Sequence, residues 1–136
     1  MGYPDKEQEM EILTRSEHVE PEIYPVLSIE DVLSMEATVR EVDVSVPIKE
    51  YIIALVSETR NDSNVLLGVS PRGAVALQRV AQGLAAMSGR SYVLPDDIKY
   101  ASIPVLSHRL IIRSSQGMSP RETIKAILER VKVRVY

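Results

Sequence analysis

The segment between Ser70 and Gly89 constrains the fold most, because it has the start, periodicity and end of one long helix. Ser70 is a favourable N-cap, Pro71 suits the first helical position, and Ser88-Gly89 is a C-terminal signal. The segment's apolar stripe at helical spacing consists of Leu77, Val80, Ala81, Leu84 and Met87. Its many glycines and alanines allow close approach by neighbours. We therefore predict a central helix that other helices cover.

The flanking segments predict further helices, each with its own start signal. We expect helices at residues 4–15, 28–42, 47–60, from 95 onward, and near 119–131. Ser28 and Asp31 have the spacing of a capping box. Two of these helices have apolar faces, formed by Ile29, Val32, Leu33, Met35 and Val39 in one, and by Ile48, Tyr51, Ile52, Leu55 and Val56 in the other.

The composition favours a mainly α fold. The chain has 136 residues, 45% of them apolar, with six Tyr and no Phe or Trp, so the core must consist of aliphatic side chains and Met. Such a core suits packed helices. Residues 91–93 and 110–112 have the character of short strands that match each other. We predict a small helical bundle of about five to six helices with short β pairing.

Charge and targeting signals narrow the class of protein. The net charge of −3 gives no electrostatic footprint for general binding to DNA or RNA, so we expect no nucleic-acid partner. The absence of cysteine excludes disulfides and thiolate metal sites. The sequence contains neither an apolar signal core nor an apolar run of about 18 residues. We expect a cytoplasmic chain without membrane insertion.

The usual catalytic motifs are absent. The sequence contains no GxxxxGK[ST] loop, GxGxxG, HExxH or GxSxG motif. His18 and His108 are far apart and lack ligand spacing, so we expect no metal site. A self-contained small enzyme is therefore the least favoured class.

The tripeptide Ser-Pro-Arg occurs twice, in two different chemical settings. At Ser119 the third helical residue is Glu122, which completes a capping box and supplies negative charge near Arg121. At Ser70 the equivalent residue is Gly73, and no acid occurs from there to the end of the helix. This second setting leaves helix amides less occupied and predicts an anion site.

Arg72 is the candidate cation of that site. An arginine at a helix N-terminus is repelled by the positive end of the helix dipole, at a cost of roughly 0.3–1 kcal/mol. An anion that binds both the guanidinium and the helix N-terminus removes this cost. A salt bridge to an acid elsewhere is an equally good interpretation of Arg72 from the residues alone. Arg79 follows on nearly the same face, where a solvated side chain is the favoured interpretation.

Several motifs in order resemble the C-terminal lid subdomain of MoxR-type AAA+ ATPases. They are LGVSPRG at 67–73, AAMSGRSYVLPDDIK at 85–99, and VLSHRL at 105–110, preceded by GYPDKEQEMEIL and the two helices that follow it. The resemblance spans Gly2 to about Ile112. It implies three parts: the end of the ATPase core with the first lid helix at 1–16, the helical lid at 17–113, and a C-terminal helix and tail at 114–136.

The resemblance also implies a function. The lid closes over ATP and Mg²⁺ that are bound mainly by a preceding core, inside a ring that is typically hexameric. Arg72 would be the sensor 2 residue that reaches the terminal phosphate, with Ser70, Pro71 and Gly73 beside the nucleotide. The implied partners are the core itself, neighbouring subunits and von Willebrand A-domain proteins, in chaperone-like assembly or activation. This chain alone should not hydrolyse ATP.

Two departures from the family pattern and one competing function remain. Gly73 stands where Ala is common in the family. Leu94 stands where a capping Thr is common, and the loss of that cap should lower the unfolding free energy by about 1 kcal/mol. The alternative to a nucleotide-sensing lid is a stand-alone helical protein-interaction module.

Overall fold

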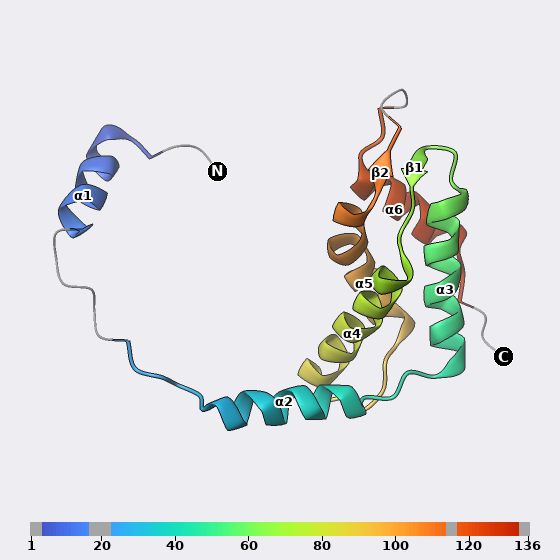
Figure 1. Cartoon of the computed structure of the whole chain (residues 1–136), viewed down its shortest axis with the longest axis horizontal. Coiled ribbons are helices and arrows are strands. Elements are labelled where there is room, and N and C mark those ends of the chain that lie inside the picture. The colour runs from blue at the N-terminus through green and yellow to red at the C-terminus, as the bar shows by residue number, and fades with distance from the viewer. Residues whose placement is uncertain (1–3, 17–22, 114–116, 134–136) are drawn as a thin grey trace.

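The computed structural model describes residues 4–16, 23–113 and 117–133. Within them the order of elements is α1 (Lys6–Ser16), α2 (Ile29–Glu41), α3 (Val46–Asn61), β1 (Val65–Leu67), α4 (Pro71–Met87), α5 (Pro95–Leu106), a 3₁₀ turn (Ser107–Arg109), β2 (Ile111–Ile112) and α6 (Pro120–Arg130). Helices α3 to α6 form a bundle, with β1 and β2 at one end of it (Figure 1). The prediction of a small, mainly helical bundle is confirmed.

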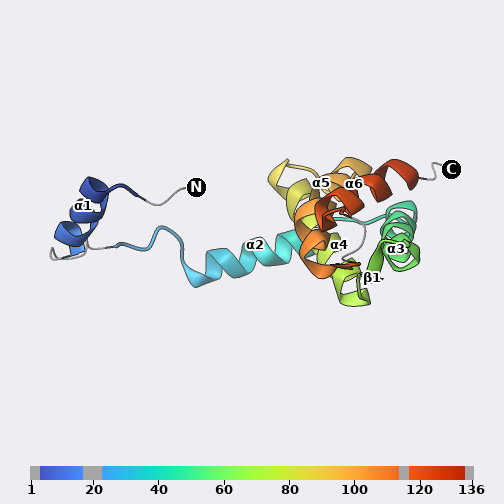
Figure 2. The same cartoon turned by 90° about the horizontal axis from the view of Figure 1, so that it is seen from above.

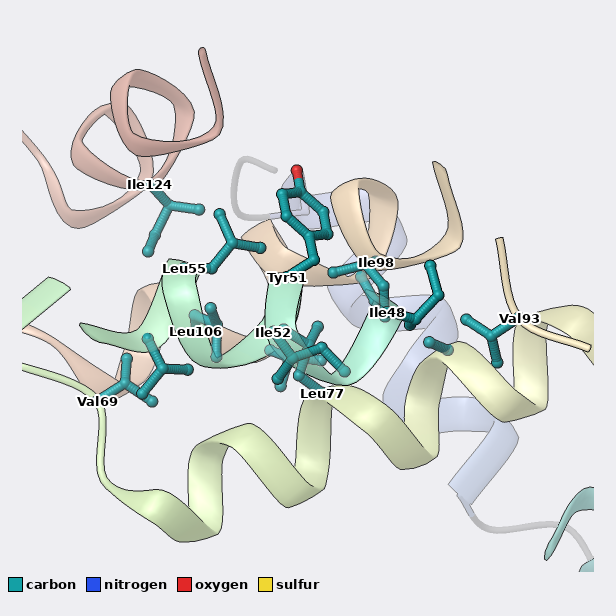
Figure 3. Packing of buried hydrophobic residues seen from close by; sticks show 14 of the residues in the cluster. Ile48, Tyr51, Ile52, Leu55, Val69, Leu77, Val93, Ile98, Leu106 and Ile124 are labelled. Carbon is teal, nitrogen blue, oxygen red and sulfur yellow. The ribbon is translucent and has the colours of Figure 1, made fainter. Parts of the chain in front are cut away.

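The core lies where α3 faces α4, α5 and α6. The α3 stripe from Ile48 to Val56 is buried as predicted. Figure 3 shows its side chains meeting Leu77 of α4, Ile98 and Leu106 of α5, and Ile124 of α6. Since Ile124 is only 1% exposed, α6 belongs to this core, although it lies beyond the motifs at 2–112 on which the sequence resemblance was based.

The buried face of α4 differs from the predicted stripe. Leu77 and Ala81 are buried, but Val80 is 41% exposed and Met87 is 87% exposed. The buried positions instead follow a four-residue spacing, formed by Gly73, Leu77, Ala81 and Ala85. Small residues dominate this ridge because it allows neighbouring helices to approach closely, and the larger side chains are left outside.

The C-terminal end of α4 matches its sequence signal, whereas Ser70 occupies the N-cap position without the side-chain hydrogen bond expected of a cap. At the C-terminus Gly89 has φ +70°, its amide bonds to Ala86 O at 2.9 Å, and the Arg90 amide bonds to Ala85 O at 2.9 Å. These bonds form a Schellman motif. The helix therefore stops where Ser88-Gly89 predicted.

The predicted pairing of residues 91–93 with residues 110–112 is wrong. Residues 111–112 pair with β1 in an antiparallel ladder, Val65 opposite Ile112 and Leu67 opposite Ile111. Tyr92 instead makes an isolated parallel bridge to Asp43. Residues 65–67 were not among the predicted strands, and their pairing with residues 111–112 is what makes them one.

Helix α2 has the predicted start and an unexpected environment. Ser28 and Asp31 form the expected capping box, but no residue of α2 is buried. Ile29 is 76% and Leu33 58% exposed. Figures 1 and 2 show α2 leading toward the bundle, with α1 apart from it. The apolar face predicted for 28–42 is thus formed but uncovered in the described chain.

Arg90 and Asp97 tie the end of α4 to the start of α5. Two hydrogen bonds of 2.8 and 2.7 Å join the guanidinium to the carboxylate, and the Leu94 amide donates to the same carboxylate at 2.8 Å. Leu94 has no side-chain acceptor, so only the Asp97 half of a capping arrangement is present. Hydrogen bonding from Arg90 holds the pKa of Asp97 below its ordinary value of 3.8.

This pair predicts an acid-dependent loss of stability. Because the folded pKa of Asp97 is lowered, its contribution is present above the ordinary value and disappears as pH falls through the folded pKa. Between about pH 5 and pH 2 the unfolding free energy of the wild type should fall more steeply than that of Asp97→Asn. Chemical denaturation at each pH measures this, and parallel curves for the two proteins would contradict it.

Candidate anion site at the start of α4

Helix α3 fixes the residue that leads into α4. Val69 is fully buried, its amide donates to Thr59 Oγ1 at 3.0 Å, and its carbonyl accepts from Arg60 Nε at 2.8 Å. Both backbone groups of Val69 are therefore held by the last turn of α3. This arrangement sets where Ser70 and Pro71 begin the next helix.

We predict that Thr59→Val weakens this anchor. Thr59 is fully buried, so losing its hydroxyl leaves the Val69 amide without a partner and should cost about 1–3 kcal/mol of unfolding free energy. Thr123→Val is the matched control. Its hydroxyl donates to Ser119 O, which also accepts the Thr123 amide, so that carbonyl stays bonded. Urea unfolding should show the larger loss at Thr59, and equal losses would contradict the anchor.

The first turn of α4 is open in the way the sequence predicted, with one difference. Ser70 is the N-cap, its side chain makes no capping hydrogen bond, and the turn contains no acid. However, the Gly73 amide bonds to Ser70 O at 2.9 Å, so it is already used by the backbone. Pro71 has no amide hydrogen. The Arg72 amide makes no hydrogen bond to any part of the chain that the structure describes.

Arg72 and Arg79 share one hollow. The hollow has a volume of about 440 Å³ and is lined by Pro71, Arg72, Val75, Ala76 and Arg79. Across the described ranges neither guanidinium has a carboxylate within salt-bridge distance. The interpretation of Arg72 as the partner of a distant acid therefore finds no support here.

Two further arginines lie beside this turn, and sequence reasoning missed both. Arg60 contacts Val69 O, and the stem of Arg109 lies 3.6 Å from where a Cβ on Gly73 would be. Arg109 Nε donates to Val105 O at 3.1 Å, and neither residue has an ion pair within the described residues. The motif VLSHRL contained Arg109 but gave no sign of its place next to α4. Neither residue lines the hollow that Arg72 and Arg79 share, so these two arginines add positive charge near the start of α4 without forming part of that hollow.

The second Ser-Pro-Arg copy has the contrasting structure. Ser119 Oγ accepts from the Glu122 amide at 3.2 Å, and Glu122 Oε2 accepts from the Ser119 amide at 2.8 Å. The hydrogen bond from the Ser119 amide lowers the pKa of Glu122. Glu122 forms no ion pair with the described Arg121, so its negative charge serves the cap. The two copies thus form a natural matched pair.

The described residues offer no cluster of metal-ligand type. Among the described residues no three His, Asp or Glu side chains are placed to hold a metal. His108 Nδ1 lies 3.1 Å from Pro104 O, and His18 lies outside the described residues. None of the helices in the described ranges has the length and apolar character needed to cross a bilayer.

Comparison with known proteins agrees with this architecture. The AAA lid domain family matches residues 57–131. The solved structure of a proposed ATPase from Cytophaga hutchinsonii ATCC 33406 superposes with a TM-score of 0.79 at 33% identity, covering 99% of this chain and 45% of that one.

Curated relatives are similar over the same length. YeaC of Bacillus subtilis is 37% identical over 99% of this chain and 44% of its own. The chaperone MoxR1 of Mycobacterium tuberculosis is 32% identical over 96% of this chain and 38% of its own. The chain therefore spans less than half the length of these relatives. It belongs to the AAA lid domain family and is a lid of the MoxR type.

Proposed function

We propose that this chain is the nucleotide-sensing lid of an ATP-hydrolysing MoxR-type AAA+ ATPase. The observation that carries the proposal is the open first turn of α4, where Arg72 has no carboxylate partner among the described residues and shares a hollow with Arg79. A terminal phosphate would supply the missing negative charge. ATP and Mg²⁺ would be bound mainly by the preceding core, which supplies the phosphoryl-transfer chemistry.

The residues present fit this ligand class. Arginine keeps its positive charge at all working pH values, and its planar guanidinium can donate two parallel hydrogen bonds to phosphate oxygens. Ser70, Pro71 and Gly73 would form the backbone edge beside the nucleotide. Pro71 would line the nucleotide side of the hollow, and the buried Gly73 would contribute backbone only. Arg72 would orient the phosphate and couple it to the position of the lid.

The wider role is proposed on the same basis. The relative MoxR1 is described as a chaperone, and we propose chaperone-like assembly or activation of partner proteins in the cytoplasm, von Willebrand A-domain proteins among them. The working form would be a ring, typically a hexamer, in which the lid meets its own core and a neighbouring subunit.

The Ser-Pro-Arg pair supplies the decisive experiment in the full-length parent. Arg72→Ala should lower the ATP turnover rate about 10²- to 10³-fold, because it removes a charge that acts on the developing phosphate charge. Arg121→Ala should change the rate by no more than about twofold, since Arg121 is an exposed residue of α6 and not of the first turn of α4. Steady-state phosphate release measures both, with ring size checked by light scattering. An intact ring with full activity after Arg72→Ala would overturn the proposal.

A further inference from the structure

A separate hollow lies on the first half of α3 and has a volume of about 310 Å³. It is lined by Pro47, Glu50, Tyr51, Ile53, Ala54 and Lys132. All of these residues except Lys132 belong to α3, and Lys132 follows the end of α6. We call this feature the α3 hollow. It shares no lining residue with the hollow that contains Arg72, so the proposed nucleotide site does not use it.

The hydroxyl group of Tyr51 is the unusual feature of the α3 hollow. Tyr51 is only 3% exposed, and its hydroxyl oxygen is the one buried side-chain oxygen or nitrogen of the described residues that has no hydrogen-bond partner. Figure 3 shows the ring pointing away from α3 on the side opposite Leu77, with the oxygen at its tip. A buried polar group without a partner is costly, so native structures rarely keep one. The missing partner must come from outside the described chain.

Two charged side chains line the same hollow without pairing. Glu50 and Lys132 are both exposed, and neither forms an ion pair within the described ranges. Lys132 can donate hydrogen bonds, and Glu50 can accept them. Burial raises the pKa of Tyr51 above its ordinary value of 10.0, so the hydroxyl keeps its proton and is a second donor. The α3 hollow therefore offers two donors and one acceptor beside an apolar wall.

These groups match a peptide unit that carries an apolar side chain. A peptide carbonyl oxygen has two lone pairs and can accept from both Tyr51 and Lys132, while a peptide N–H can donate to Glu50. The opposite charges of Glu50 and Lys132 disfavour a ligand with net charge of either sign. The volume is near the lower limit of ligand pockets, about 300 Å³. It suits one residue with its peptide bonds.

We propose that the α3 hollow binds an uncharged apolar residue in a peptide segment of a partner protein. The Tyr51 hydroxyl donates to a main-chain carbonyl of that segment, and the aliphatic side chain packs on Ile53 and Ala54. This interaction surface goes beyond the nucleotide-sensing role proposed above and does not depend on it. Its test therefore contains no nucleotide and measures no ATP turnover.

Titration of the 136-residue chain with N-acetyl-L-leucine amide tests the site, because this probe is one apolar residue between two amides. Backbone amide signals of residues 50–54 and Lys132 should shift in the NMR spectrum and saturate. The expected dissociation constant is about 1 mM for a ligand of about twelve heavy atoms. N-acetylglycine amide lacks the apolar side chain and should bind at least about tenfold more weakly. Absence of a saturable shift at these residues overturns the proposal.

Tyr51→Phe separates binding from folding. The hydroxyl has no partner in the described chain, so its removal should leave the urea midpoint of unfolding unchanged or raise it. The same variant should bind the leucine probe about tenfold more weakly, because the probe's carbonyl loses a buried donor. Tyr100→Phe is the matched control, since it removes a hydroxyl from a residue of α5 that is 73% exposed and outside the hollow. Equal affinities of Tyr51→Phe and the wild type overturn the proposal.

Two further arms identify the source of the ligand and use no Tyr51 variant. Free leucine has charged ends in place of the two amides and should bind more weakly than the probe. Tighter binding of free leucine would mean a site for amino acids and would overturn the peptide site. Removal of residues 134–136 should leave the affinity for the probe unchanged. A gain in affinity would mean that the chain's own C-terminus fills the hollow, which also overturns the proposal.

Discussion

Gly68→Ala is expected to destabilise the protein by about 3 kcal/mol, a large part of the stability of a small domain. A Cβ at residue 68 would lie 2.7 Å from Arg60 Cγ, 2.8 Å from Arg60 Cα and 2.9 Å from Arg60 N. Two of these atoms belong to the backbone of α3 and cannot move aside alone. Either β1 or the last turn of α3 must shift, and the hydrogen bonds that hold Val69 would lengthen.

Gly83→Ala is the matched control for this substitution. Gly83 lies inside α4, and a Cβ there would meet nothing within 4 Å. Since alanine is the better helix former, this change should stabilise the protein by about 0.5–1 kcal/mol. Urea unfolding should therefore give opposite signs for two identical chemical changes. A Gly68→Ala protein as stable as the wild type would show that the approach of β1 to α3 is not tight.

Gly73→Ala is expected to cost about 1–3 kcal/mol, although it adds a helix former to α4. A Cβ on residue 73 would clash with Val69 Cγ1, and Val69 is fully buried and branched at Cβ. The valine methyl has little room to turn away. The unusual glycine of the LGVSPRG motif is thus explained by the valine four residues before it.

A double-mutant cycle checks this explanation. Val69→Ala alone should cost about 1–3 kcal/mol because it leaves a cavity. In the double variant the new methyl at residue 73 occupies space that the valine vacated, so the total loss should be smaller than the sum of the single losses by at least about 1 kcal/mol. Additive losses in chemical denaturation would mean that Val69 is not the obstacle.

The candidate site could be predicted in part from its sequence. Ser70, Pro71 and the missing acid after Arg72 indicated an open helix start, and the absence of a side-chain cap at Ser70 agrees with that. Arg60 and Arg109 could not be predicted, because they come from α3 and the 3₁₀ turn and approach α4 only through folding. The roles of Arg72 and its neighbours toward nucleotide stay predictions.

The sequence by itself determined the helices and their ends. Capping boxes at Ser28 and Ser119 and the glycine at 89 act through hydrogen bonds to residues a few positions away, so local sequence is sufficient to specify them. The helical class follows from the same local preferences together with an aliphatic core.

Only the tertiary structure decided which faces are buried and which strands pair. Val80 and Met87 fit the predicted apolar stripe of α4, yet they are exposed. Helices α3 and α5 approach α4 closely, and only the face that carries Gly73 and the alanines has side chains small enough to allow this. Residues 111–112 pair with β1 because α3 brings β1 to them. Burial and pairing depend on contacts between distant residues, which periodicity along one segment does not contain.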